Sequence, residues 1–383
     1  MNIDKSNWKR VRFGDVAIQQ KECIDTNTTE LNRYIAGEHM NTDDIHLRKW
    51  GTVGDGYLGP AFMRKFEKGN ILYGSRRTYL KKVAVADFDG ITANTTFVIK
   101  ANDKIINPIL LPFLMLSDNF TKHSIENSKG SVNPYINWKD IANYEFLLPP
   151  KEEQPQLAEL LWAADEVVER EKEVLKNIDI YQKTYMNQKF EDSKQTIISF
   201  SELLIINPVY KKELDKDRSA SFISMADVSN EGMIINKEDK QIKELERKGL
   251  TPFIENDILF AKITPCMENG KGAIATNLTN GIGFGSTDFH VLRAKNNSDI
   301  KFCFYLSKMD SFRQLAGRLM TGSAGQKRVQ PEFFKQYKFH APKTENRYEI
   351  GEKMDLLENR KINIKKQIES SQQLKSVLIN KIF

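Results

Sequence analysis

Cysteine is scarce in this sequence, and long apolar runs are absent. The three cysteines, Cys23, Cys266 and Cys303, are far apart and form no CxxC pair, so neither a disulfide framework nor a zinc site is predicted. No run of about 18 apolar residues occurs, which argues against a membrane span. Residues 1–12 are polar and lack the apolar core of a signal peptide, so we expect a soluble protein of the cytoplasm.

Motifs that bind nucleotides, metals or methyl donors are also missing. No GxxxxGK(S/T) sequence occurs, so no ATP-binding loop is predicted, and the five histidines show no metal-ligand spacing. Asn207-Pro208-Val209-Tyr210 resembles the Asn/Asp-Pro-Pro-Tyr motif of amino-methyltransferases, but its second proline is missing and no glycine-rich strand–loop–helix precedes it. We therefore read it as a turn, and we expect no catalysis, metal or cofactor in this chain.

The sequence does contain an internal repeat, in which one unit occurs twice. Its 383 residues suffice for two or three domains, and the two halves match at a separation of about 190 residues. The order of the matches is preserved and their spacing drifts by only a few residues, which chance similarity does not explain. The matched segments include 34–35 with 222–223, 69–73 with 256–260, 98–101 with 291–294, Phe120 with Phe312, 129–131 with 321–323, and 141–146 with 334–339.

Each globular half mixes short Val-, Ile- and Phe-rich runs with Gly, Asn and Asp turns, which is typical of a mixed α/β (α+β) domain. A single helix is expected near the end of each half, at 108–124 and at 299–320. The expected strands are 70–73, 82–86, 96–100, 257–261, 271–275 and 289–293. The order of the strands in their sheets does not follow from this pattern.

A long amphipathic segment follows each half, at 151–190 and at 343–383. Its apolar residues recur at steps of three and four, which favours a helix far longer than is usual in globular domains. The first segment has six Lys or Arg and nine Asp or Glu, and the second has nine and six. Opposite net charge favours packing of one helix on the other, so we predict an antiparallel coiled coil. Helices that stay separate, or that pack on their own domains, are the alternative.

This pattern predicts a pseudo-two-fold chain of four parts: a domain at 1–150, a helix at 151–190, a second domain at 191–342 and a helix at 343–383. The residues expected at the coiled-coil or partner interface are Leu157, Leu161, Ala164, Val168, Leu175, Ile178, Ile350, Met354, Leu357, Ile364, Ile368 and Leu378.

One stretch of the first half contains several basic residues and no acidic ones. Between Lys68 and Ala86 there is no Asp or Glu, and tyrosines alternate with the cations. A guanidinium can bind guanine in two places or clamp a phosphate, whereas Lys acts as a point charge on phosphate. A solvated loop rim is the alternative. The predicted DNA-contacting residues of this half, including those of the Gly-Ser loop near 130, are Arg64, Lys65, Ser75, Arg76, Arg77, Tyr79, Lys81, Lys82, Lys129, Ser131 and Asn133.

The second half has a similar acid-free stretch between Ser311 and Pro331. It surrounds a polar loop, 321–326, whose small residues let backbone N–H groups approach an anion, and Gln326 could read adenine. A loop needed only for chain reversal is the alternative. The predicted DNA-contacting residues of this half are Lys262, Thr264, Lys271, Ser286, Thr287, Arg318, Ser323, Gln326, Lys327 and Arg328.

With the repeat and the helices in place, the chain resembles the specificity (S) subunit of type I restriction–modification systems over its whole length. Residues 144–154, which contain Leu148-Pro149-Pro150 and Glu153-Gln154, are similar to that family's LPPLxEQ junction between a target recognition domain and a long helix. The second junction lacks one proline and has Asn346 in place of Gln. Gly322-Ser323 and Gln326 resemble the family's GSxxQ loop, of which the first half keeps only Gly130-Ser131.

The resemblance implies that each domain is a target recognition domain that reads one half of a split target in double-stranded DNA, with the helix pair fixing the unread spacer. It implies two methyltransferase subunits as partners, which bind S-adenosylmethionine, and a restriction subunit that uses ATP and Mg²⁺ where one exists. A type IIB-like specificity subunit and a coiled-coil adaptor with two protein-binding domains remain open as alternatives. A cryptic methyltransferase or nuclease would require activity of the isolated chain, which we do not expect.

Overall fold

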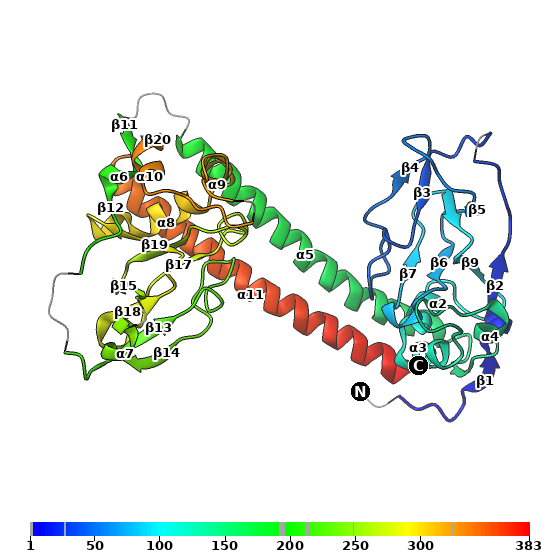
Figure 1. Cartoon of the computed structure of the whole chain (residues 1–383). Coiled ribbons are helices and arrows are strands. Elements are labelled where there is room, and N and C mark those ends of the chain that lie inside the picture. Colours follow the sequence, from blue (N-terminus) through cyan, green and yellow to red (C-terminus); the bar gives the residue numbers. More distant parts are fainter. Residues whose placement is uncertain (1–2, 27, 191–195, 211–214, 248, 324) are drawn as a thin grey trace. The chain divides into compact units, whose positions relative to one another are not determined.

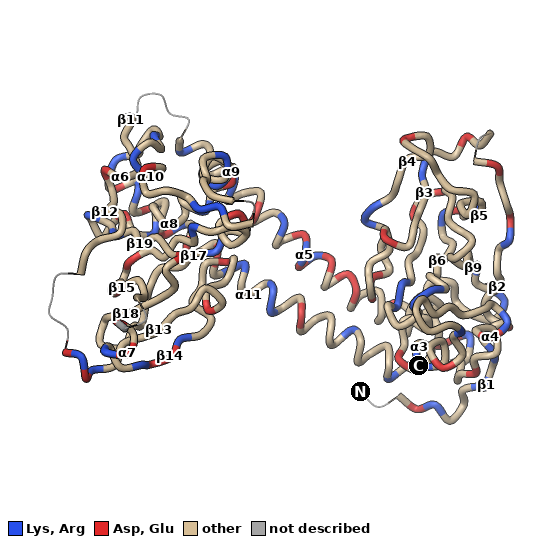
Figure 2. Tube along the Cα trace, in the orientation of Figure 1, with Lys and Arg blue, Asp and Glu red and all other residues tan. Residues whose placement is uncertain are grey.

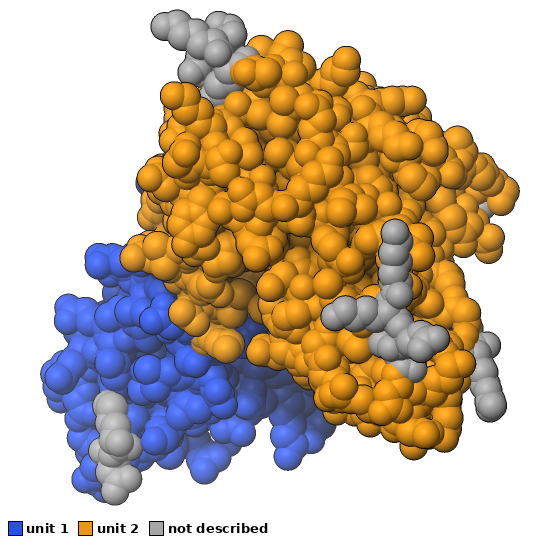
Figure 3. All heavy atoms as spheres, turned by 90° about the vertical axis from the view of Figure 1, so that its left-hand side faces the viewer, with its two compact units in different colours: residues 1–172, 367–383 blue, residues 173–366 orange. Residues whose placement is uncertain are grey.

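The structure is a computed structural model that describes residues 3–26, 28–190, 196–210, 215–247, 249–323 and 325–383 (Figure 1). It contains two compact units, which Figure 3 colours separately. Unit 1 comprises Met1–Lys172 and Gln367–Phe383, and unit 2 comprises Glu173–Lys366. The boundaries fall inside both long helices, so they do not test the predicted four-part division of the chain.

Unit 1 has a two-stranded ribbon and two four-stranded sheets. The sheet orders are β1-β10, β2-β9-β6-β7 and β4-β3-β8-β5, and every pairing is antiparallel except that of β3 with β8. The strands are β1 (Lys9–Arg12), β2 (Ala17–Gln20), β3 (Arg33–Ile35), β4 (Gly51–Thr52), β5 (Phe62–Phe66), β6 (Ile71–Gly74), β7 (Val83–Val85), β8 (Gly90–Ala93), β9 (Thr96–Ala101) and β10 (Glu145–Leu148). The helices are α1 (Phe13–Val16), η1 (Thr78–Leu80), α2 (Leu111–Leu116), α3 (Asp118–Glu126), α4 (Trp138–Ala142) and the start of α5 (Gln154–Phe190).

Unit 2 repeats this topology strand for strand. Its sheets are β11-β20, β12-β19-β16-β17 and β14-β13-β18-β15, and the parallel pairing is that of β13 with β18. The strands are β11 (Thr196–Ser199), β12 (Leu204–Ile206), β13 (Ser219–Ile223), β14 (Glu238–Gln241), β15 (Thr251–Ile254), β16 (Ile258–Ala261), β17 (Gly272–Ile274), β18 (Ile282–Gly285), β19 (Phe289–Ala294) and β20 (Lys338–Ala341). The helices are α6 (Phe200–Leu203), α7 (Ile242–Arg247), η2 (Thr279–Gly281), η3 (Asn297–Asp299), α8 (Ile300–Lys308), α9 (Asp310–Arg318), α10 (Glu332–Gln336) and α11 (Thr344–Ile382).

The predicted repeat and mixed α/β class are therefore confirmed, and the predicted strands end within one residue of the observed ones. The prediction of a single helix at 108–124 and at 299–320 is wrong, because each segment forms two helices. The break lies at Ser117 and at Met309, whose backbones are extended (ψ 150° and 140°). Ser117 turns the break into a helix start, since its hydroxyl accepts a hydrogen bond from the Phe120 amide.

The core of unit 1 takes in one end of each long helix. Leu157 and Leu161, from the start of α5, share an apolar cluster with Ile379 and Ile382, from the end of α11. Deep in this cluster lies Phe120, fully buried. Burying apolar surface stabilises the folded state by about 25 cal/mol per Å², so such contacts are the main stabilising contribution. The helix ends are therefore parts of the domain core.

Unit 2 shows the same arrangement with the helices exchanged. Ile350 and Met354, from the start of α11, pack in one cluster with Met186 and Phe190, from the end of α5. Each unit thus holds the start of the helix that follows its sheets and the end of the other helix. The alternative, in which the helices pack on their own domains, is therefore correct for the ends of the helices.

Between these cores the helices contact each other through polar side chains. In unit 1, Lys375 pairs with Asp165 at 3.0 Å. In unit 2, Lys361 pairs with Asp179 at 2.7 Å, and Gln182 donates to Glu358 at 3.2 Å. Residue numbers on α11 fall as those on α5 rise, so the pair is antiparallel, as predicted. Both charge signs occur along α5 and α11 (Figure 2).

The predicted interface residues divide by burial along the two helices. Leu157, Leu161, Val168, Ile350 and Met354 are buried. The other seven are half-buried: Ala164, Leu175, Ile178, Leu357, Ile364, Ile368 and Leu378. None of the helices in the described part of the chain is both long and apolar enough to cross a membrane.

Candidate nucleic-acid interface

In unit 1 the backbone joins the two loops that the sequence singled out. Arg76, just after β6, forms an isolated bridge with Tyr135, and the Arg77 amide donates to the Pro134 carbonyl at 2.7 Å. Lys129 and Tyr135 exchange amide hydrogen bonds of 2.8 and 2.9 Å, which close the second loop into a hairpin. We refer to residues 75–79 with 128–135 as loop pair 1.

In unit 2 the equivalent loops are joined in the same way. Ile263, just after β16, bridges Arg328, and the Thr264 amide donates to the Lys327 carbonyl at 3.1 Å. Thr321 and Arg328 close the hairpin with hydrogen bonds of 3.0 and 2.8 Å. We refer to residues 262–264 with 321–323 and 325–329 as loop pair 2. Each unit therefore brings together two acid-poor loops that are far apart in the sequence.

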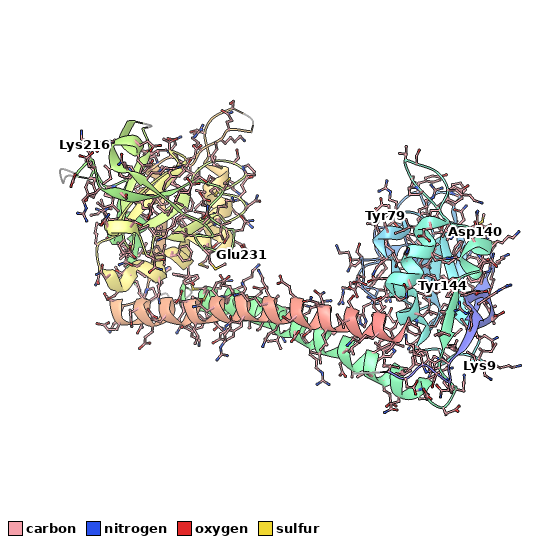
Figure 4. The ribbon with its side chains drawn as sticks, turned by 90° about the horizontal axis from the view of Figure 1, so that it is seen from below. Lys9, Tyr79, Asp140, Tyr144, Lys216 and Glu231 are labelled. Atoms are coloured by element: carbon pink, nitrogen blue, oxygen red, sulfur yellow. The ribbon has the colours of Figure 1, made fainter. Side chains whose placement is uncertain are left out.

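Loop pair 1 presents most of its predicted residues to solvent. The exposed residues are Arg76, Arg77, Tyr79, Lys129, Ser131 and Asn133. Arg77 has a left-handed backbone (φ 51°), so its direction is fixed by the turn and by its bond to Pro134. Ser75 is buried and donates its hydroxyl to the Thr95 carbonyl. Tyr79 and Asp140, which lies 3.5 Å from Lys129, are on the side of unit 1 away from the helix ends (Figure 4).

Four other predicted contacts of unit 1 are engaged within the protein. Arg64 donates to the Lys21 carbonyl at 2.6 Å, and Lys65 pairs with Glu22 at 3.0 Å. Lys81 pairs with Asp118 at 2.5 Å, and Lys82 donates to the Gly37 carbonyl. Their roles on DNA stay predictions, but these cations are less free than Arg76 and Arg77.

Loop pair 2 is less basic at its surface. Ser323, Gln326 and Lys327 are exposed, as are Thr287 before β19 and Arg318 at the end of α9. Arg328 pairs with Asp288 at 2.8 Å, and Lys271 donates to the Met225 carbonyl at 3.0 Å.

Three predicted residues of this half are partly covered. Ser286 accepts a hydrogen bond from the Asp288 amide. The Thr264 hydroxyl is buried and has no partner among the described residues. Burial lowers the pKa of Lys262, and the neighbouring Arg328 charge adds to this effect. The two loop pairs have the same arrangement of backbone hydrogen bonds, but they differ in charge and in their side chains.

A family comparison bears directly on this repeated arrangement. The model of the type I restriction modification DNA specificity domain matches the chain twice, at residues 5–179 and 200–374. The chain belongs to this family. The two matches cover most of its length and coincide with the internal repeat.

The chain also resembles curated members of the family over part of its length. It is 35% identical over 158 residues to the type I restriction enzyme EcoEI specificity subunit of Escherichia coli, and 43% identical over 125 residues to that of EcoAI. These alignments cover 40% and 31% of this chain but only 26% and 20% of the relatives. The aligned part therefore spans about a quarter or less of the relatives' length.

Solved structures share the fold over the whole chain. One, from a study of complex assembly and conformational transition of the type I R-M system, aligns with a TM-score of 0.58 at 16% identity and covers 98% of this chain and 97% of that one. The S subunit of the type I restriction-modification system from M. genitalium also gives 0.58, at 15% identity, covering 100% and 98%. At these identities the likeness shows the fold alone.

Two exposed apolar side chains, one within loop pair 1 and one in a nearby loop, were not predicted from the sequence of this family member. Tyr57 is 91% exposed and Val132 is 89% exposed. The loop of Tyr57 lies near loop pair 1, because the Asn94 amide donates to Ala61 and the Ser75 amide donates to the adjacent Thr95. A lone tyrosine between Gly54, Gly56 and Gly59 is the sequence signal that could have drawn attention to it.

Among the described residues, one cluster has side chains close enough together to hold a cation, namely Asp44, His46 and Glu169. Arg48 already pairs with both carboxylates, with hydrogen bonds of 2.7 Å to Asp44 and 2.6 Å to Glu169. Burial acts to raise the pKa of Asp44, yet hydrogen bonds from Arg48 and the His46 amide lower it to about 2. The cluster is therefore an ion-pair network that joins the loop before β4 to α5.

Proposed function

We propose that this chain selects the DNA sequence on which a partner methyltransferase acts, with each unit reading one half of a split target. The observation that carries the proposal is the repetition of a paired-loop surface, loop pair 1 and loop pair 2, on two copies of one fold. Two related surfaces suit two half-sites, as in other proteins whose repeated domains face repeated DNA sites. Different side chains on the same frame suit half-sites of different sequence.

The chemistry of the loop pairs supports DNA as the ligand. Arg76 and Arg77 are exposed, and a guanidinium can form two hydrogen bonds to guanine or clamp a phosphate. Gln326 offers an amide that can pair with adenine. Lys129 and Lys327 add exposed charge for phosphate contacts, which position a protein without reading sequence.

We infer that α5 and α11 set the spacing between the two half-sites. They have 37 and 39 residues, so each is about 55–60 Å long at 1.5 Å per residue. Because their ends are part of the domain cores, a change in helix length would be passed to both reading surfaces. A helix pair of fixed length would therefore act as a ruler for the unread spacer.

The proposal assigns catalysis to partners. Two methyltransferase subunits would bring S-adenosylmethionine, and a restriction subunit, where one exists, would bring ATP and Mg²⁺. The family membership and the lack of nucleotide-binding or methyl-donor motifs in the sequence support this division of labour. We place the assembled complex in the cytoplasm, where it would meet DNA.

The test is to express the chain with its partner methyltransferase and to map adenine methylation across the host genome. A split motif with a fixed spacer is expected, and it should vanish when the chain is left out. A methylome without a two-part motif would overturn the proposal. Binding of the purified complex to DNA should weaken steeply with salt, because phosphate contacts release counterions; salt-independent binding would favour a protein adaptor instead.

A further inference from the structure

We propose that Arg313, on α9, is a positioning residue that holds the loop between β16 and β17 (residues 262–271) and thereby determines what loop pair 2 reads. The inference rests on the proposed function and extends it to a side chain that does not itself face DNA. Four observations carry it: the burial of Arg313, the loop contact it makes, the path from that contact to loop pair 2, and a counterpart in unit 1.

Arg313 is a buried cation with few partners. Its side chain is 8% exposed, and its guanidinium lies 5.1 Å from the ring centre of Phe260. One nitrogen, Nη1, donates to the Met267 carbonyl, while Nε and Nη2 are buried without a hydrogen-bond partner among the described residues. Burial lowers the pKa of this group to about 10. A buried charge with so few acceptors costs folding free energy, so packing alone does not account for an arginine here.

The contact of Arg313 lies at the centre of the loop. The Met267 carbonyl also accepts the Gly270 amide, and the Met267 amide donates to the Ile263 carbonyl at 2.9 Å. The Asn269 amide donates to the Pro265 carbonyl at 2.9 Å. The loop is thus a compact turn built around Met267, and Arg313 fixes that turn to α9.

The same turn leads directly into loop pair 2. Ile263, whose carbonyl receives the Met267 amide, forms a bridge with Arg328, and the next residue, Thr264, donates to the Lys327 carbonyl. A shift of the turn at Met267 would therefore move Ile263 and the hairpin that carries Lys327. All the residues on this path belong to unit 2, so the effect of Arg313 on the loop can reach the exposed hairpin within a single unit.

Unit 1 makes an equivalent connection between loop and helix, but its cation lies on the loop instead of on the helix. There the cation is Lys81, on the loop between β6 and β7, and it reaches Asp118 at the start of α3 (2.5 Å) and the carbonyl of Leu116, the last residue of α2 (3.3 Å). The position in α3 that matches Arg313 in the repeat is Thr121, which carries no charge. Both units therefore tie the loop to the helix with one cation, placed on the loop in unit 1 and on the helix in unit 2.

The test compares Arg313→Met with the wild type in the full chain assembled with its methyltransferase. Methionine fills similar space without donors, so the variant should unfold at the same or a higher denaturant concentration. Its methylome should nevertheless lose discrimination by roughly tenfold or more at one or more positions of a single half-site, which is the range of one base contact. Gln314→Ala, an exposed neighbour on α9, is the matched control and should leave the motif unchanged.

Hydrogen exchange of the amides of 263, 264 and 266–271 in Arg313→Lys gives a second readout that does not depend on the methylome. Faster exchange in this loop, with the rest of unit 2 unchanged, is expected, because a lysine keeps the charge but not the planar donor geometry. An unchanged motif in a folded Arg313→Met complex, or unchanged exchange in Arg313→Lys, would overturn the inference. A wild-type methylome without a split motif would overturn the proposed function instead, and the exchange experiment would still decide whether Arg313 holds the loop.

Discussion

Asp165 on α5 and Lys375 on α11 form an ion pair in unit 1 with 3.0 Å between Oδ1 and Nζ, and both side chains are buried. The other carboxylate oxygen of Asp165 accepts a hydrogen bond of 2.6 Å from Nε2 of His46, which lies in the loop before β4. One carboxylate thus connects the globular part of unit 1 to both helices. In unit 2, Lys365 of α11 reaches Glu231 at 3.4 Å, and Glu231 is seen close to the helices in Figure 4.

The first prediction concerns the removal of this carboxylate charge. Asp165→Asn should lower the free energy of unfolding by about 3–5 kcal/mol, because it leaves Lys375 buried without a counter-charge. Urea unfolding of the purified chain measures this change. The control is Glu166→Gln, one residue along α5, whose pair with Arg170 is exposed (60% and 74%) and should contribute less than about 1 kcal/mol. Equal effects of the two substitutions would contradict the prediction.

The second prediction concerns pH. The hydrogen bond to Asp165 raises the pKa of His46 above its usual value of 6.5. Protonated His46 therefore stabilises the folded chain fully below about pH 6.5, and this contribution is lost as the pH rises through the folded-state pKa. The difference in unfolding free energy between the wild type and His46→Gln should accordingly shrink from pH 6 towards pH 9.

Asp165 itself does not titrate in that window. Burial acts to raise its pKa, but the hydrogen bonds from His46 and Lys375 and their charges lower it below 3.8. Its contribution is lost only as the pH falls through that low value, well outside the range measured for His46. A difference between wild type and His46→Gln that stays constant from pH 6 to pH 9 would therefore rule out the proton-linked contribution of His46.

The third prediction concerns loop pair 1. Arg76→Ala or Arg77→Ala should cost about 1–3 kcal/mol in binding and change or abolish recognition of one half-site, the effect expected of a bidentate base contact. The methylome of each variant complex measures this. Lys122→Ala removes an exposed cation from α3 outside loop pair 1 and is the control. Unaltered motif and affinity in both arginine variants would place loop pair 1 off the DNA.

Comparison of sequence and structure shows why some features could be predicted and others could not. The repeat in the sequence predicted the twin topology, since matched segments such as 98–101 and 291–294 became the equivalent strands β9 and β19. The breaks at Ser117 and Met309 were missed because each helix pair has one continuous apolar pattern, and the break is set by backbone geometry that this pattern does not encode.

Long-range contacts were out of reach for a different reason. His46, Asp165 and Lys375 are separated by 119 and 210 residues, so no local pattern connects them. The joining of Arg76 to Tyr135 is also a long-range contact, because Arg76 follows β6 and Tyr135 lies in the loop between α3 and α4. The basic loops are recognisable in the sequence by their lack of acids, but whether a cation is exposed, as Arg77 is, or paired, as Lys81 is, depends on the folded arrangement.

The fourth prediction concerns helix length. A heptad added to α5 after Lys176, with a matching heptad added to α11 after Lys366, should lengthen the unread spacer of the methylated motif. Seven residues add about 10.5 Å of helix, which corresponds to roughly three base pairs at 3.4 Å each. A heptad in α5 alone is the control: it shifts Asp179 and Gln182 out of register with Lys361 and Glu358, so the complex should lose activity. A double-insertion complex that methylates with the original spacer would show that the helices do not set the spacing.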